Sequence, residues 1–178
     1  MRKGLVLPDD DAQAARYDAA RAWLAADGWD HYEVSNAARP GHRSQHNLGY
    51  WRRDDYLGLG PGAHSLLGAE RWANVSDIAE YATRLAAGAD IRGERESLTP
   101  SQIVAETMFL GLRVREGVDL AAASRRLGVD CAAVYEAVLA RHTAQGTLQR
   151  DGMRVWMPAS RWFVAHDVLA DFLEPRLL

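Results

Sequence analysis

Residues that could take part in ligand chemistry are concentrated between positions 46 and 65 of this chain. One block reads His46-Asn47-Leu48-Gly49-Tyr50-Trp51, and a second runs from Tyr56 to Ser65. Residues four apart share one face of a helix, so helical spacing would place His46 over Tyr50 and Asn47 over Trp51. An imidazole beside large aromatic faces can bind a flat, iron-bearing ligand axially. The same spacing is also expected of a capped helix held by core aromatic residues, because histidine is often partly buried without binding anything.

The second block contains glycines at 58, 60 and 62, which alternate with Leu59 and Pro61. This alternation predicts a strand from Tyr56 to Leu67 with one bare backbone face, which a ligand or another element could approach closely. The block does not match a phosphate-binding loop, since Pro61 lacks an amide donor and no Lys-Ser/Thr follows. We expect a packing role ahead of a ligand role, because glycines in strands often mark bulges.

Composition restricts the classes of partner and of metal site. The chain has 178 residues and a net charge of −3, which gives no long-range attraction to nucleic acid or anionic lipid. Cys131 is the only cysteine, so the chain cannot form an internal disulfide or supply the thiolates of an iron–sulfur cluster, and we expect a buried structural thiol. No apolar run approaches the roughly 20 residues that span a bilayer. We therefore expect a soluble, cytoplasmic protein without a secretion signal.

The first ninety residues predict alternating helix and strand. The acidic run after Pro8 predicts a helix that continues to Ala26 and stops at Gly28. Its buried face should carry Ala12, Ala15, Ala19 and Trp23. A short strand is expected at Tyr32–Asn36, which makes half of an α/β unit. Asp77 and Glu80 form a capping box for a short helix that ends at Gly88. The polar segment Ala89–Leu98 is the expected domain boundary.

The remaining residues predict three helices, a hairpin and a last helix, which is a winged-helix-like order. The helices should open at Thr99 (with Pro100 and Gln102), Asp119 and Asp130, the hairpin should span Thr147–Met157 with its turn at Asp151-Gly152, and Ser160 should cap a helix that ends near Leu173. From Thr99 to Leu178 nine arginines balance nine acidic residues. A DNA-binding face needs an excess of positive charge, so we expect no nucleic-acid partner.

Three segments together resemble one family. Tyr32-Glu33-Val34-Ser35-Asn36-Ala37-Ala38-Arg39-Pro40-Gly41, the block at 46–51 and the block at 56–65 match the HemW heme chaperones in order and spacing. These chaperones are relatives of the oxygen-independent coproporphyrinogen III dehydrogenases (oxidases) of the HemN type. The His-Asn-x-x-Tyr-Trp block favours the chaperone branch. The resemblance covers essentially the whole chain, including a helical part similar to that family's C-terminal domain.

The resemblance implies a mixed α/β and α+β fold. Residues 1–90 would be late strands and helices of an incomplete (β/α) radical S-adenosylmethionine barrel, and residues 99–178 a winged-helix-like C-terminal domain. Full-length members hold a [4Fe-4S] cluster through a C-x3-C-x2-C motif and bind S-adenosylmethionine. This sequence lacks that motif, so we expect it to bind neither group and not to be catalytic alone, although enzymatic activity with a partner stays open.

The resemblance assigns His46 as the heme-iron ligand, with Tyr50 and Trp51 as aromatic wall or as packing that orients the helix. It places His64 toward the barrel interior, where it could contact substrate or cofactor. His31, His42, His142 and His166 are expected at the surface or at caps. The leading hypothesis is a heme-binding segment of a HemW-like chaperone, with heme and a heme-acceptor protein as partners.

Two alternatives stay open. One is a fragment of a coproporphyrinogen III dehydrogenase, part of porphyrin biosynthesis, that acts only with an N-terminal, cluster-binding half of the barrel. The other treats residues 99–178 as a protein-interaction domain. A partial barrel would expose a strand edge near Tyr32–Ser35, so we also expect self-association.

Overall fold

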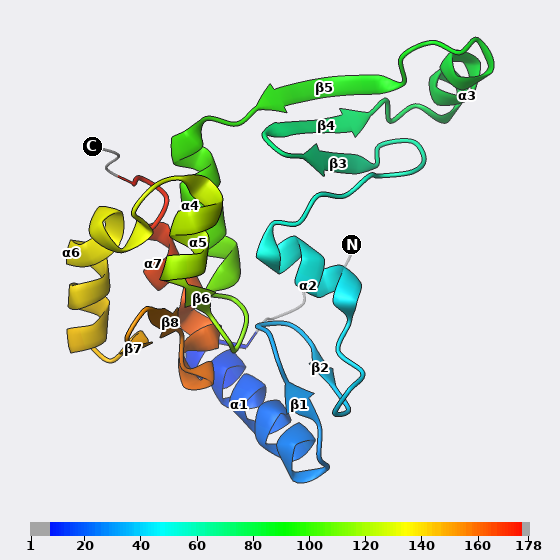
Figure 1. Ribbon diagram of the computed structural model, residues 1–178. Helices are drawn as coiled ribbons and strands as arrows, with labels where there is room; N and C mark the ends of the chain where they lie inside the picture. Colours follow the sequence, from blue (N-terminus) through cyan, green and yellow to red (C-terminus); the bar gives the residue numbers. More distant parts are fainter. Residues whose placement is uncertain (1–7, 176–178) are drawn as a thin grey trace.

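The structure is a computed structural model, and it describes residues 8–175. Within this range short antiparallel sheets are connected by helices (Figure 1). The helices are α1 (Asp10–Ala26), α2 (Gln45–Arg52), α3 (Ile78–Ala86), α4 (Pro100–Gly111), α5 (Leu120–Leu127), α6 (Cys131–Ala144), the 3-10 helix η1 (Ala159–Val164) and α7 (Ala165–Ala170). The strands are β1 (Asp30–His31), β2 (Ala37–Ala38), β3 (His64–Leu67), β4 (Glu70–Asn74), β5 (Arg92–Ser97), β6 (Val118–Asp119), β7 (Gln149–Asp151) and β8 (Arg154–Trp156).

The mixed helix-and-sheet class expected from the sequence is confirmed. The sheets have strand orders β1-β2, β3-β4-β5 and β6-β8-β7, and each strand pair of the described residues is antiparallel. The alternating α/β unit expected after α1 is therefore not formed there, and these residues close no barrel. Figure 1 shows the β3-β4-β5 sheet extending away from the helical C-terminal part, with α3 at its far end.

Helix α1 has the predicted bounds, with Asp9 accepting from the amide of Ala12, but its predicted buried face is wrong. Trp23 is 71% exposed, whereas Tyr17 packs against the C-terminal core. The Tyr17 ring lies 5.6 Å from that of Phe163, and its hydroxyl donates to the carbonyl of Val34. In an alanine-rich helix the few large side chains decide which face is buried. Here Tyr17 packs against Phe163, and Trp23 is left exposed.

The predicted strand at Tyr32–Asn36 is wrong, because this segment connects β1 to β2. Glu33 forms an isolated bridge with Val114, and the amide of Arg115 donates to the carbonyl of Tyr32. Tyr32 and Glu33 are consequently buried, at 1% and 0% exposure. The strand edge expected to be exposed here is covered by the segment after α4, which removes the reason given for self-association.

The predicted strand from Tyr56 to Leu67 is also shorter in the structure. Tyr56 bridges Leu66, β3 begins only at His64, and the glycine residues form the loop between them. Gly60 and Gly62 have positive φ angles of 104° and 67°, which suit a loop rather than a strand. The close approach expected at the glycines is nevertheless present, and it is made by backbone of the same chain.

The C-terminal part confirms the three predicted caps at Thr99, Asp119 and Asp130, and also the hairpin β7–β8. The cap predicted at Ser160 is wrong: η1 begins after Pro158 without a side-chain cap, since the proline already sets the backbone direction. The predicted link Ala89–Leu98 contains β5, one of the two edge strands of its sheet. The main core lies among α4, α5, α6, α7 and β8, and includes Met108, Leu112, Leu120, Tyr135, Leu139, Val155 and Phe172.

No helix within residues 8–175 is both long and apolar enough to cross a bilayer.

Candidate functional site

Helix α2 carries the predicted ligand block. It begins where the Ser44 side chain accepts from the amide of Asn47, at 3.3 Å. Its buried side chain is Leu48, which clusters with Tyr32, Ala38 and Val114. This small cluster fixes which face of α2 points outward.

His46 and Tyr50 lie together on the outward face, as the helical spacing predicts. Their rings meet edge to face with centroids 4.7 Å apart and planes at 76°. Tyr50 in turn meets Tyr56 edge to face at 4.7 Å. His46 is exposed and Tyr50 is 39% exposed. Sequence reasoning did not include Tyr56 in this row of three rings, although it opens the glycine block. Burial, and then the neighbouring Tyr50, raise the pKa of Tyr56 above its ordinary value.

Trp51 is not brought beside His46. It packs against the cluster around Leu48, and the Arg113 guanidinium lies 5.5 Å from its ring centre. Five residues along a helix turn the side chain by about 140°, so this separation follows from helix geometry. Trp51 also lines a cavity of about 580 Å³ that neither His46 nor Tyr50 reaches. The cavity is bordered by α2, α4, α5 and the turn before β6, including Arg52, Thr107, Gly111, Glu116, Ala122, Arg126 and Arg154.

His64 lies at the exposed start of β3, opposite Ala73 of β4. It borders a separate groove of about 480 Å³ with Arg71, Trp72, Ala73, Glu94, Arg95 and Glu96. The structure therefore places the two predicted histidines on different elements, each with its own surroundings.

The other histidines divide into two groups. His42 and His166 are exposed, as expected. His142 lies in the last turn of α6 but is buried, so of the two expected positions, surface or cap, the surface is excluded. Thr147 and Asp171 lie 2.8 and 2.9 Å from its two ring nitrogens. His31 is partly buried, with its ring edge-on to Trp162 at 4.8 Å. Burial and then Arg21 lower the pKa of His31.

Cys131 is buried at the start of α6, as predicted, and burial raises the pKa of its thiol. Its amide donates to the hydroxyl of Ser124. One thiol inside a packed core does not fit a cluster that needs three thiolates. Within residues 8–175 no group of three histidine, cysteine or acidic side chains is arranged to hold a metal ion.

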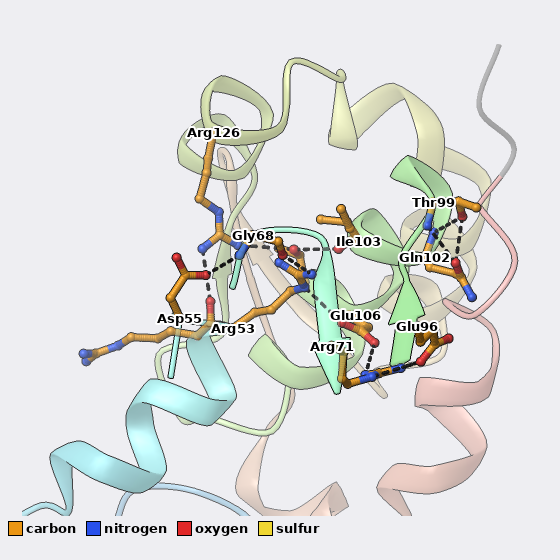
Figure 2. Close-up of polar contacts among 12 residues, drawn as sticks. Arg53, Asp55, Gly68, Arg71, Glu96, Thr99, Gln102, Ile103, Glu106 and Arg126 are labelled. Atoms are coloured by element: carbon orange, nitrogen blue, oxygen red, sulfur yellow. Dashed lines mark hydrogen bonds and ion pairs between the residues drawn. The ribbon is translucent and has the colours of Figure 1, made fainter. Parts of the chain in front are cut away.

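A network of charged side chains joins α2 to the C-terminal part, and sequence reasoning missed it. The Glu106 carboxylate of α4 accepts from Arg53 at 2.9 Å and from Arg71 at 2.7 Å (Figure 2). Arg53 follows the last residue of α2, and Arg71 belongs to β4. The partners are 53 and 35 positions away from Glu106, so no local sequence pattern connects them.

Known proteins match this chain both in sequence and in fold. A model of the HemN C-terminal domain matches residues 98–164. The heme chaperone HemW of Mycobacterium tuberculosis is 38% identical over 174 residues, which is 97% of this chain and 43% of that protein. HemW of Bacillus subtilis is 33% identical over 175 residues, covering 97% of this chain and 46% of the relative. The chain is thus similar to HemW heme chaperones over nearly its whole length.

The chain spans less than half the length of these HemW relatives and matches their C-terminal part. A solved structure of coproporphyrinogen III oxidase (HemN) from Escherichia coli, described as a radical SAM enzyme, gives a TM-score of 0.70. That likeness covers 94% of this chain and 42% of the other, at 16% sequence identity, and it shows a shared fold. The resemblance drawn from the sequence blocks is thereby confirmed.

Proposed function

We propose that this chain is the heme-binding segment of a HemW-type heme chaperone, and that His46 is the axial ligand of the heme iron. The observation that carries the proposal is the exposed imidazole of His46, held edge-on by Tyr50 on the outward face of α2. The relatives' designation as heme chaperones supports heme as the cargo.

The chemistry of this face suits a porphyrin. Heme iron accepts a neutral imidazole nitrogen as axial ligand, and the flat macrocycle gains from apolar contact. Tyr50 and Tyr56 supply aromatic surface next to His46, and the edge contact limits how far the imidazole can turn. An open face also suits a chaperone, because heme that is taken up must be passed on to an acceptor protein. Trp51 then acts in packing α2, and we do not assign it to the heme wall.

We propose that this chain performs no radical chemistry alone. S-adenosylmethionine and a [4Fe-4S] cluster are expected for full-length members of the family, and the cluster supplies the electron for cleavage of that cofactor. Cys131, the one thiol of the chain, cannot replace three cluster ligands. His64, at the exposed start of β3, is proposed as a residue that faces substrate or cofactor in the longer relatives.

We also propose a finer description of the fold. Residues 99–178 follow a winged-helix-like order, supported by α4, α5 and α6 and by the β7–β8 hairpin, which pairs with β6. Residues 1–90 correspond in this proposal to late barrel elements of the longer relatives.

The test uses the purified chain, hemin and absorption spectroscopy. Hemin should develop a shifted Soret band with the parent chain. Mutation of a residue that only supports a metal ligand already lowers metal affinity by about tenfold or more. Loss of the ligand itself in His46→Ala should therefore weaken hemin binding by roughly tenfold or more. His42→Ala is the matched control, since His42 is also exposed and lies just before α2. Equal hemin affinity of His46→Ala and the parent would contradict the ligand assignment.

A further inference from the structure

The last turn of α2 ends in an unusual way. The amide of Asp54 donates to the carbonyl of Gly49, and the amide of Arg53 donates to that of Tyr50, which is the hydrogen-bond pattern of a Schellman motif. The residue in the left-handed position of this motif is usually glycine. Here it is Arg53, with φ of 57°, and it is the one residue other than glycine with a positive φ within residues 8–175.

The side chain of Arg53 explains why glycine is not used. Its Nε donates to Glu106 at 2.9 Å and one terminal nitrogen donates to the carbonyl of Gly68, also at 2.9 Å (Figure 2). The Arg53 side chain is 7% exposed and that of Glu106 is 22% exposed. A left-handed arginine costs about 1 kcal/mol or more, and the charge-assisted hydrogen bonds of Arg53 to Glu106 and to the carbonyl of Gly68 offset part of that cost. The same carboxylate holds Arg71 of β4, which fixes Glu106 from the other side.

A second contact reaches the same turn from α5. Arg126 donates to the carbonyl of Arg52 at 3.1 Å and to the hydroxyl of Thr107 at 3.2 Å. The last carbonyls of a helix lack partners within the helix, so Arg126 satisfies one of them. Both contacts come from residues 98–164, the part that matches the HemN C-terminal domain. That region therefore contacts the end of α2 at two points, the side chain of Arg53 and the main-chain carbonyl of Arg52.

We propose that Glu106, acting through Arg53, is a positioning residue for the heme-ligating face of α2. The inference rests on the proposed role of His46. Glu106 fixes the left-handed turn that ends α2, the turn fixes the orientation of the helix, and the helix presents His46 and Tyr50 four residues apart. The C-terminal part of a HemW-type protein thereby sets the geometry in which the imidazole meets iron.

The decisive variants should keep the fold and remove the contact between Arg53 and Glu106. Arg53→Gly retains the left-handed turn without strain but loses both side-chain contacts. Glu106→Gln retains the size of the side chain but loses its charge, and Glu106→Asp keeps the charge on a shorter side chain. Glu96→Gln is the matched control, because Glu96 bonds Arg71 and not α2. Circular dichroism and thermal melting confirm that each variant is folded before it is assayed.

Arg53→Gly and Glu106→Gln should each raise the rate of hemin loss by about fivefold or more, the lower range of coupling between sites. Both should also change the Soret position or the reduction potential of bound heme, with partial rescue in Glu106→Asp, while Glu96→Gln resembles the parent. In a His46→Ala background neither substitution should have a further effect. Folded variants with parental hemin loss and spectra would overturn the proposal.

A measurement without heme separates this inference from the proposed function. The NMR signals of the His46 ring report the ring current of Tyr50 across their 4.7 Å contact. Arg53→Gly and Glu106→Gln should shift those signals, whereas Glu96→Gln should not. Unchanged His46 signals would refute the positioning role even if hemin binding is confirmed. Shifted His46 signals in a chain that does not bind hemin would support the positioning role of Glu106 and contradict heme ligation by His46.

Discussion

The backbone of Gly58 lies directly against the backbone of His64. A Cβ atom added at Gly58 would fall 2.2 Å from the carbonyl oxygen of His64 and 2.9 Å from the carbonyl carbon of Ala63. The side chain of Asn74 closes the loop from the other side, since its amide donates to the carbonyls of Gly58 and Gly60. The glycine block therefore serves a close contact of main chain with main chain, which supports the predicted packing role.

Gly58→Ala should destabilise the protein, because the obstacle is main chain that cannot move aside. We expect a loss of about 1–3 kcal/mol in the free energy of unfolding, as for other overpacked positions. Gly49→Ala is the control: it lies inside α2, and its added Cβ would meet only the Asp54 side chain at 3.6 Å. That change should stabilise by about 0.5–1 kcal/mol. Urea denaturation measures both, and equal stability of the two variants would contradict the close-approach argument.

Tyr135→Phe should destabilise the C-terminal core. The buried hydroxyl of Tyr135 donates to the carbonyl of Phe172 at 2.9 Å, and the two rings lie 5.1 Å apart. Phenylalanine keeps the ring contact and leaves the carbonyl without its partner. The expected cost is about 1–2 kcal/mol, measured by denaturant unfolding at neutral pH. A smaller loss, within experimental error of zero, would mean that the carbonyl finds another donor.

The same tyrosine should make the protein sensitive to alkali. Burial raises the pKa of Tyr135 above its ordinary value of 10.0. Above pH 10 the unfolded chain therefore loses the phenolic proton while the folded chain keeps it. Stability is fully present below that pH and declines as the pH rises toward the folded pKa. The decline between pH 9 and pH 11 should be smaller in Tyr135→Phe than in the parent, and parallel curves would exclude this residue as the cause.

His31 should titrate below its ordinary pKa of 6.5. Burial lowers its pKa first, and the Arg21 guanidinium, 3.2 Å from Nδ1, lowers it further. As the pH falls below 6.5 the unfolded chain binds this proton first, so the contribution of His31 to stability is present above 6.5 and is lost toward the folded pKa. NMR titration of the ring measures the pKa directly.

Arg21→Ala should move the His31 pKa upward toward 6.5. Arg16→Ala is the matched control, since Arg16 is an exposed arginine of the same helix. A titration midpoint of the His31 ring at or above pH 6.5 in the parent chain would contradict the lowering of its pKa by burial and by Arg21.

Local signals in the sequence were sufficient for three of the helix starts in the C-terminal part. The caps at Thr99, Asp119 and Asp130 each depend on one side chain and an amide two or three residues away, so they could be read without tertiary information. The pairing of His46 with Tyr50 likewise follows from helical spacing. The same geometry separates Trp51 from His46 by more than a third of a turn, and applying it strictly would have removed Trp51 from the predicted heme wall.

Features that depend on distant partners could not be read in this way. Tyr32–Asn36 has the residue types of a strand, but its backbone partners are Val114 and its neighbours, some eighty positions away. The left-handed Arg53 carries no sequence signal either, since arginine is a poor choice for that conformation until Glu106 is in place. Tertiary contacts decided both, and these are the contacts that a single sequence leaves open.

The hydrogen bonds of Arg53 and Arg71 to Glu106 have a consequence for chimaeras made by exchanging segments with related proteins. A chimaera that exchanges only the segment matching the HemN C-terminal domain would replace the acid and retain both bases. Arg53 and Arg71, which share the Glu106 carboxylate here, would then face whatever side chain the other protein carries at that position. Recombination should therefore carry all three positions together, and a crossover at residue 98 is unsafe although it coincides with the start of a recognised domain.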